Sequence, residues 1–550
     1  MNPDTAEIAI VDATSELVSP FACPPGAPRL SAAGVSPHPA SDSLPSFGAP
    51  LRSRRRVRRT SEPGARGLLP FDLSAADPAK LLAVREVWRA LWSSRLLVWA
   101  AGIGTVVAVG FGPAHNAFNP PGVTRGFGWL GNLLAAPAAR WDAAWYLVIA
   151  HYGYRPDLGA FTSSRTAFFP LYPLCLSVIS HLGVPPILAG VLLSSSALAL
   201  ALYGIHRLTT LELARAGATT VARARSATTD RASGGEVARL AVMVTAFAPM
   251  AFFFSAVYSE ALYLALSVGV FLCARQGRWA WVAVLGALAA ATRSAGVVLL
   301  LPAALLYLYG PREDLTPDFP RSEGPRAKGR TFATTAERRG PGLFGASFVS
   351  HAAACWRMGR PRYKLRRDFL WLGLVPAGLG IYIVYLALGG GDALMPFHAQ
   401  AVWSRHFAGP YVGVWDGAKA AFEGARQLFS VGRHVYFPAA GGSPDIDAGH
   451  NLMLLAFLLA AVPMIVGVLR MLPLAYGAYV IAALALPLSY PVASQPLMSL
   501  PRFLVVLFPL SIWLAAWLAA HPRARVPVLV GSGLLMAFFV AQFATWHWVA

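Results

Sequence analysis

Three stretches of this chain are predominantly apolar over about twenty residues, the length of helix that crosses the roughly 30 Å hydrocarbon core of a bilayer. They cover residues 91–112, 186–206 and 526–545. Inside lipid every backbone N–H and C=O must be satisfied within the protein, so only helices and closed barrels span a membrane. Barrel strands alternate polar and apolar residues, whereas these runs are continuous. The sequence therefore predicts an all-α polytopic membrane protein, a bundle of transmembrane helices.

The composition excludes a water-soluble globule. Hydrophobic residues make up 56% of the chain and charged residues only 13%, against roughly a quarter charged in soluble domains. The 46 basic and 26 acidic residues give a net charge of +20. The arginines gather in a few connecting segments, as the positive-inside rule describes for cytoplasmic loops, so we expect no nucleic-acid partner. The four cysteines lie far apart, without the spacing of a disulfide framework or a zinc site.

Residues 1–85 differ in composition from the rest of the chain. They are rich in Pro, Ser, Ala and Gly and contain a run of arginines between positions 52 and 59. No basic start followed by a short apolar core is present, so this is not the pattern of a secretory signal peptide. We expect a disordered, basic cytoplasmic tail.

The basic segments, placed on the cytoplasmic side, define a topology of about eleven spans. We expect an N-terminal transmembrane catalytic half and a C-terminal transmembrane half, joined by a basic cytoplasmic loop. The N-terminal half covers residues 86–309 and contains a first outer loop at 113–185. The cytoplasmic loop covers residues 310–368. The C-terminal half covers residues 369–550 and contains an outer loop at 389–450.

Two stretches need a special interpretation within this topology. Residues 279–309 are apolar except around Arg293, and we interpret them as two short helices that turn there at the outer face. Residues 167–182 are also apolar, but a full span here would place the arginine-bearing loop 207–236 outside. We therefore expect a re-entrant or interfacial helix over 167–182.

Unusual polar and aromatic residues gather on the expected outer side. In the first outer loop they are Arg140, Trp141, Asp142, Trp145, Tyr146 and His151. From other segments the same side receives Tyr258, Glu260, Arg293, Gln400, Trp403, Arg405 and Arg502. Because these residues come from separated parts of the chain, they form a candidate site where a lipid headgroup could meet them.

Each charged residue also has a purely structural interpretation. Asp142 precedes an apolar run and could cap a helix, and Glu260 could open the helix that follows it. An acid beside an apolar surface helix is nevertheless costly unless it is paired or used, and Arg140, two positions earlier, is not its facing neighbour on a helix. Arg293 and Arg502 could be interface residues whose charged ends extend toward water.

The aromatic residues have an alternative as well. Trp141, Trp145 and Tyr146 could belong to the aromatic belt that anchors helices at headgroup level. His151 could be an ordinary surface histidine. These alternatives stay open from the sequence.

A carboxylate and fixed guanidinium groups at the outer leaflet suit the transfer of a group from a lipid-linked phosphate to a hydroxyl. The carboxylate can take the proton of the attacking hydroxyl. The planar fork of arginine can bind the departing phosphate and stabilise its charge.

Several ordered motifs resemble the PIG-V family. They are Arg140-Trp141-Asp142 with Tyr146 and Ile149-Ala150-His151-Tyr152-Gly153-Tyr154, then Ala167-Phe168-Phe169-Pro170-Leu171-Tyr172-Pro173, Tyr258-Ser259-Glu260 and Ser499-Leu500-Pro501-Arg502-Phe503. Eukaryotic members of this family are the second mannosyltransferases of glycosylphosphatidylinositol assembly. The resemblance covers residues 90–310 and, more loosely, residues 370–546.

The resemblance implies a GT-C-type integral membrane glycosyltransferase that takes mannose from polyprenyl-phosphate mannose and inverts the anomeric centre. It implies that Asp142 is the catalytic base. We expect Glu260 to orient the acceptor or the base, and we expect the donor phosphate to be bound by Arg293, Arg405 and Arg502. Candidate substrate-binding residues are Arg140, Trp141, Trp145, Tyr146, His151, Tyr258, Gln400 and Trp403. Residues 167–182 would border the polyprenyl groove.

The expected partners are the polyprenyl-phosphate mannose donor, a lipid-linked or glycan acceptor, and membrane lipid. We expect the site on the extracytoplasmic face of a plasma membrane, with the N-terminus cytoplasmic. No cofactor and no metal ligands are expected, although a divalent metal is left open. The Arg-, Pro- and Ala-rich composition is typical of a high-GC bacterium, which lacks glycosylphosphatidylinositol anchors, so the acceptor and its linkage stay open.

Two other functions remain open from the sequence. A lipid or sugar transporter or flippase would need polar groups near the bilayer midplane, and few expected spans contain ionisable residues at mid-depth. A transferase of another lipid-linked group, such as an O-acyltransferase, would call for a buried histidine in a span. His206 and His398 lie instead at span ends or in loops.

Overall fold

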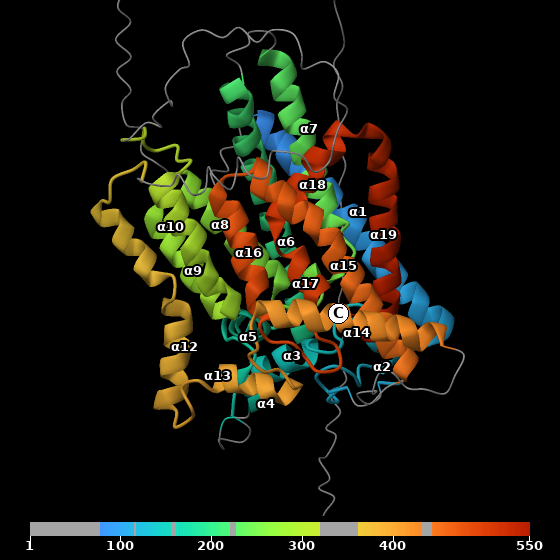
Figure 1. Cartoon of the computed structure of the whole chain (residues 1–550). Coiled ribbons are helices and arrows are strands. Elements are labelled where there is room, and N and C mark those ends of the chain that lie inside the picture. The colour runs from blue at the N-terminus through green and yellow to red at the C-terminus, as the bar shows by residue number, and fades with distance from the viewer. Residues whose placement is uncertain are drawn as a thin grey trace, which may run out of the picture. The chain divides into compact units, whose positions relative to one another are not determined.

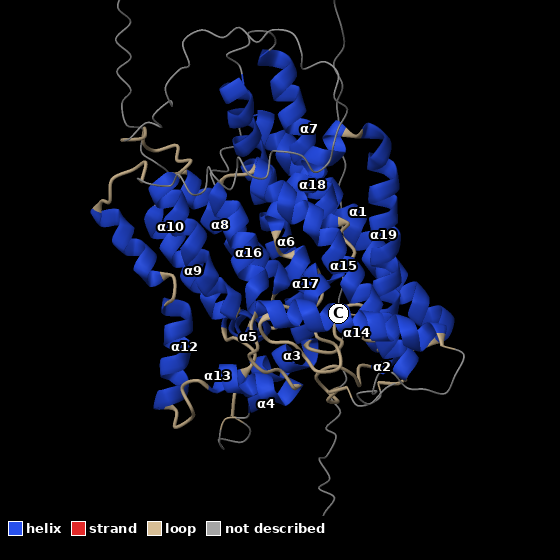
Figure 2. Cartoon of the chain, in the orientation of Figure 1, coloured by secondary structure: helices blue, strands red, loops and turns tan. Residues whose placement is uncertain are grey.

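The computed structural model of this chain describes residues 78–114, 117–155, 161, 163–220, 227–318, 361–430 and 443–549. These residues form helices, turns and two isolated β-bridges, and none of them lies in a strand. Figure 2 shows the same helical composition. The predicted all-α fold class is confirmed.

The helices run as follows. The N-terminal half contains α1 (Pro78–Val109), α2 (Gly128–Ala135), α3 (Ala143–Tyr152), α4 (Ser163–Thr166), α5 (Leu171–His181), α6 (Pro186–Thr220), α7 (Ala227–Ala246), the 3-10 helix η2 (Ala251–Phe254), α8 (Glu260–Arg275), α9 (Trp279–Thr292), η3 (Ser294–Leu299) and α10 (Leu300–Tyr309). The C-terminal half contains η4 (Arg367–Leu374), α12 (Ala377–Leu388), α13 (Met395–His398), η5 (Ala399–Trp403), α14 (Pro410–Phe429), α15 (Pro444–Met471), α16 (Leu474–Leu488), α17 (Leu500–Val505), α18 (Phe508–Ala520) and α19 (Pro522–Ala544).

Four of these helices are long and apolar enough to cross a membrane alone, namely α1, α6, α15 and α19. A fifth span results if η4 and α12, bent by 43° at a short break, are counted together. The remaining stretches that we expected to span hold shorter helices. Some are divided by breaks such as the one between α17 and α18, whereas α8 and α16 are single helices of 16 and 15 residues. The described residues thus form a polytopic membrane protein, with fewer uninterrupted spans than the expected eleven.

The turn predicted at Arg293 is confirmed. Helix α9 ends at Thr292, Arg293 is extended, and η3 leads into α10. The rings of Trp279, at the start of α9, and Tyr307, near the end of α10, have centroids 4.7 Å apart, so the two helices run back along each other. Gly296 permits the tight turn, because a Cβ on it would lie 2.1 Å from the carbonyl carbon of Ala289.

Several expected loop boundaries differ from the structure. Helix α1 begins at Pro78, so residues 78–85 belong to a helix and not to the tail; residues 1–77 lie outside the described part. The expected loop 207–236 is largely helical, because α6 continues to Thr220 and α7 starts at Ala227. Alanine-rich sequence favours this continuation beyond the apolar stretch. Of the expected loop 310–368, residues 319–360 lie outside the described part.

The expected outer loops also contain helices, and these lie together. Helix α4 of the first outer loop contacts α13 and η5 of the second. Figure 1 shows α3, α4, α13 and α14 at the same end of the long helices, opposite the start of α7. Helix α5, with 11 residues, is about half the length of a span. Its re-entrant or interfacial placement stays a prediction.

We expect the two ends of the bundle to lie on opposite sides of the membrane. In a chain whose native cysteines are replaced, the exposed positions Arg367→Cys and Lys419→Cys should react with a membrane-impermeant thiol reagent from opposite sides. The measurement is labelling of oriented vesicles of both polarities. Labelling of both positions from the same side would contradict the assignment of 310–368 to the inside and 389–450 to the outside.

Candidate active site

Asp142 lies at a tight turn that leads into α3. The preceding residue, Trp141, has a φ of 56°, in the left-handed region that side-chain-bearing residues rarely adopt. Asp142 occupies the N-cap position of α3, but its side chain makes no capping hydrogen bond. Its Oδ2 instead accepts a hydrogen bond from Nη1 of Arg502 at 2.7 Å. The helix-cap interpretation of this carboxylate is therefore wrong.

Glu260, the first residue of α8, is almost fully buried and shared by two arginines. Its Oε1 accepts a hydrogen bond from Nη1 of Arg293 at 2.6 Å and lies 3.2 Å from Nε of Arg502. Asp142, Arg502, Glu260 and Arg293 thus form a continuous line of contacts, which we call the ion-pair chain. Its members come from the start of α3, from α17, from the start of α8 and from the break after α9. The structure thus brings these four predicted residues together, and their roles stay predictions.

Aromatic rings enclose the two arginines of the ion-pair chain. The guanidinium carbon of Arg502 lies 5.7 to 5.8 Å from the ring centroids of Phe253, Tyr258 and Phe503. That of Arg293 lies 5.4 Å from the Phe503 ring. Cation–π contacts of this kind favour a guanidinium that has lost part of its water. The side chains are only 12% and 16% exposed, so neither arginine extends outward to the membrane interface.

Arg405 adds a third cation beside the ion-pair chain. It follows η5, and its backbone forms an isolated bridge with Val492. Burial and the charge of Arg502 lower the pKa of Arg405 to about 10, although the charge of Asp142 opposes this shift. Within the described residues its guanidinium has neither a hydrogen bond nor an ion pair. Arg405 is therefore a partly buried cation whose charge no carboxylate contact neutralises.

An aromatic row lies beside the same end of α3. Trp145 stacks on Phe118, with centroids 4.1 Å apart, and also faces Phe168 at 6.1 Å. Phe168 meets the edges of Tyr146 at 5.1 Å and Trp403 at 5.9 Å. The structure thus brings the predicted Trp145, Tyr146 and Trp403 together around Phe168, from both outer segments. Phe118 had no motif that could have marked it.

Arg140 and Trp141 point toward the C-terminal segment. Nε of Arg140 donates to the carbonyl oxygen of Ala544 at 3.3 Å, and its guanidinium lies 4.7 Å from the Trp546 ring centroid. Trp141 meets the rings of Trp546 and Trp548 edge to face. These contacts anchor the chain end against the turn before Asp142. Both side chains therefore pack against the C-terminal segment and not against the carboxylates of the ion-pair chain.

The remaining predicted substrate-binding residues are dispersed. His151 is exposed at the far end of α3, about 13 Å from Asp142 at 1.5 Å per residue, where it contacts the ring of Tyr152. Gln400 lies in η5, next to the loop that contains Arg405. Tyr258 is fully buried, and its hydroxyl contacts the backbone around Asp142. The structure thus separates His151 from the ion-pair chain.

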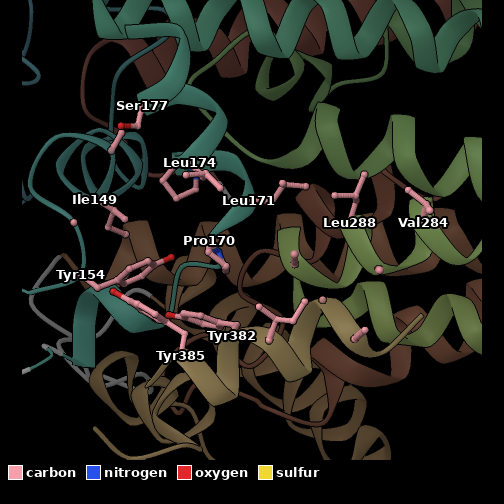
Figure 3. A pocket seen from close by; sticks show the side chains of 18 of the residues that line it. Ile149, Tyr154, Pro170, Leu171, Leu174, Ser177, Val284, Leu288, Tyr382 and Tyr385 are labelled. Atoms are coloured by element: carbon pink, nitrogen blue, oxygen red, sulfur yellow. The ribbon is translucent and has the colours of Figure 1, made fainter. Parts of the chain in front are cut away.

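An apolar cavity of about 830 Å³ lies between α3, α5, α9 and the η4–α12 pair. Figure 3 shows Leu171 and Leu174 of α5, Leu288 of α9 and the tyrosines Tyr154, Tyr382 and Tyr385 around it. Two helices connect the cavity to the ion-pair chain. Ile149 and Ala150 of α3 line the cavity, and Asp142 directly precedes this helix. Ala291 of α9 also lines the cavity, and Arg293 directly follows that helix. Helix α5 lies within residues 167–182, which we expected to border a polyprenyl groove, whereas we had no expectation for α12.

The described residues contain no group of three or more His, Cys, Asp or Glu side chains placed to hold a metal ion. The expectation of a reaction without a cofactor or metal stays a prediction.

Comparison with known proteins identifies the segment that contains most of this site. A family model described as mannosyltransferase (PIG-V) matches residues 112–307. The PIG-V resemblance is thereby confirmed over this segment. No curated protein and no solved structure matches the chain. The PIG-V segment contains Asp142, Glu260 and Arg293, whereas Arg405 and Arg502 lie beyond it, and the match supports mannosyl transfer at the level of the family.

We expect Glu260→Gln to lower the thermal stability of the protein. The amide keeps the shape but removes the charge that two buried guanidinium groups share, and breaking a buried pair in this way costs about 3–5 kcal/mol. The measurement is the melting temperature in detergent. The control is Asp392→Asn, whose carboxylate pairs with His398 on the exposed surface, so the melting temperature of this variant should stay close to that of the wild type. Equal shifts for the two variants would contradict a buried, strongly paired Glu260.

Proposed function

We propose that this protein is an inverting mannosyltransferase that moves mannose from a polyprenyl-phosphate donor to a hydroxyl of a lipid-linked or glycan acceptor. The observation that carries the proposal is the state of Asp142. Arg502 holds Oδ2, whereas Oδ1 has no hydrogen bond within the described residues, and the side chain is 22% exposed. An oriented carboxylate with one free oxygen suits the role of a general base.

The reaction follows from this arrangement. The acceptor oxygen attacks C1 of the mannose while Oδ1 of Asp142 takes the hydroxyl proton. The bond between C1 and the phosphate oxygen breaks, and its electron pair stays on that oxygen. The polyprenyl phosphate therefore gains one negative charge as Asp142 loses one. Guanidinium groups already in place stabilise the charge where it develops.

The charge balance of the site suits a donor with a single negative charge. Arg293, Arg405 and Arg502 supply three positive charges, and Asp142 and Glu260 supply two negative charges, which leaves +1. A sugar phosphodiester carries one negative charge and would neutralise this balance. Arg405, which lacks an ion pair, is the cation best placed to bind it. Arg502 contributes mainly by holding the two carboxylates.

The apolar cavity suits the lipid part of the donor. Its volume of about 830 Å³ lies within the range of ligand sites, and alanine, leucine, isoleucine and proline side chains, with three tyrosines, dominate its lining. Polyprenyl chains are hydrocarbon without charge, so their transfer from the bilayer into such a cavity loses no polar interactions. The aromatic row at Trp145, Phe168 and Trp403 offers ring faces for the sugar. We place this site on the extracytoplasmic face of a plasma membrane.

We expect Asp142→Asn to reduce mannosyl transfer by about 10²- to 10⁴-fold, the usual contribution of a general base. Asparagine keeps the size and one oxygen for Arg502 but does not accept the proton. The assay uses purified protein in detergent, radiolabelled polyprenyl-phosphate mannose and a membrane extract as the source of acceptor. Asp416→Asn on α14 is the matched control. Turnover of Asp142→Asn near that of the wild type would exclude Asp142 as the base.

The same assay separates binding from chemistry through Arg405→Ala. Loss of this cation should raise the KM for the donor more than it lowers kcat, whereas Asp142→Asn should lower kcat with little change in KM.

We expect Leu174→Trp, which fills part of the cavity, to raise the KM for a long-chain donor by roughly tenfold because overpacking disfavours the bound chain. The variant should use a donor with only two isoprene units almost as well as the wild type does. Leu192→Trp on α6 is the control, since Leu192 is similarly exposed but does not line the cavity. An equal KM increase for the short donor, or for the control variant, would contradict a polyprenyl site here.

A further inference from the structure

Three consecutive residues where the chain enters α8 each hold a different part of the candidate site. Tyr258 contacts the backbone of the turn before α3, Ser259 contacts α3 itself, and Glu260 holds the two arginines of the ion-pair chain. The adjacent N–H of Val257 donates to the carbonyl oxygen of Ala138 at 2.9 Å, which fastens the same two segments together.

The Tyr258 hydroxyl bridges the two ends of the turn that presents Asp142. It donates to the carbonyl oxygen of Arg140 at 3.0 Å and accepts from the N–H of Asp142 at 3.1 Å. Between these contacts lies Trp141, whose left-handed backbone is disfavoured for a residue with a side chain. Such a conformation persists only where surrounding contacts enforce it. The hydroxyl is therefore one of the groups that fix the direction in which the Asp142 carboxylate leaves the backbone.

Ser259 fixes the next turn of the same helix. Its Oγ lies 2.9 Å from the hydroxyl of Tyr146, four residues beyond Asp142 on α3. Both side chains are buried. The start of α3 is thus held at two points by neighbouring residues of one segment.

We propose that Tyr258 and Ser259 are positioning residues that set the Asp142 carboxylate for proton removal, an inference that rests on the proposed function. Neither hydroxyl is available to substrate, because both are buried and hydrogen-bonded within the protein. The expected role of Tyr258 in substrate binding is replaced by this indirect one. Glu260, the next residue, fixes the other side of the carboxylate through Arg502.

The test compares Tyr258→Phe with Tyr307→Phe. The side chain of Tyr307 is also buried. Its hydroxyl accepts a hydrogen bond from the backbone N–H of Arg366 and donates one to Asp368. Tyr307 lies near the end of α10, at the opposite end of the α9–α10 hairpin from Arg293 and the candidate site. Each substitution removes one hydroxyl that bonds two residues, and Tyr307→Phe should lower the melting temperature at least as much as Tyr258→Phe because it also loses a hydrogen bond to a carboxylate. Only the first disturbs the turn at Asp142.

We expect Tyr258→Phe to lower kcat by about tenfold or more, because small misplacements of a catalytic group have effects of this size. The KM for the donor should stay within twofold of wild type, since Arg405 and the cavity are untouched. Tyr307→Phe should change neither constant. Ser259→Ala should show the same signature as Tyr258→Phe and serves as the test if Tyr258→Phe does not fold.

The outcomes separate this inference from the proposed function. A wild-type protein that transfers no mannose overturns the proposed function, and the positioning role with it. An active wild type whose kcat persists within twofold in Tyr258→Phe, or in Ser259→Ala where that variant serves as the test, overturns the positioning role alone. An equal loss of kcat in Tyr307→Phe also overturns it, because the effect would then follow from lost stability.

Discussion

The sharing of Glu260 by two arginines is the interaction on which the arrangement of the site depends. A carboxylate that is 1% exposed needs charged partners, because an unpaired buried charge is strongly destabilising. Arg293 comes from the break in the α9–α10 hairpin and Arg502 from α17, so satisfying Glu260 draws these two segments to the start of α8. Arg502 then reaches Asp142, and the start of α3 joins the same cluster. The contacts that stabilise this end of the bundle are thus also the ones that orient the candidate base.

Much of the fold follows from the sequence, with particular exceptions. Continuous apolar runs predicted the helices correctly, and the polar interruption at Arg293 predicted the hairpin of α9 and α10. Hydropathy measures how apolar a stretch is and does not show where its helix is interrupted. It therefore did not predict that two of the expected spans are divided, one into α7 and η2 and the other into α17 and α18. Composition also misplaced the start of α1, the end of α6 and the start of α7, where polar residues continue a helix beyond the apolar stretch.

The site was predictable in its members but not in its pairings. Acids and arginines at the ends of apolar segments identified Asp142, Glu260, Arg293 and Arg502, yet Arg502 and Asp142 are 360 positions apart and nothing local relates them. The role of Tyr258 depends on contacts with backbone atoms, which side-chain patterns do not reveal. The position of α12 beside the cavity was not predictable either, because an apolar helix surface that faces lipid has the same composition as one that faces a ligand.

The ion-pair chain also resolves a conflict within the proposed reaction. A general base needs a negative charge before the proton moves, whereas a leaving phosphate needs positive charge afterwards. When Oδ1 of Asp142 takes the proton, Arg502 keeps its contacts with Oδ2 and with Glu260 and remains in place, but the charge of Asp142 no longer neutralises it. That charge becomes available as the phosphate gains its own. In the proposed reaction, a fixed cation whose charge is released in this way stabilises the products without a change of fold, since no charged side chain has to move.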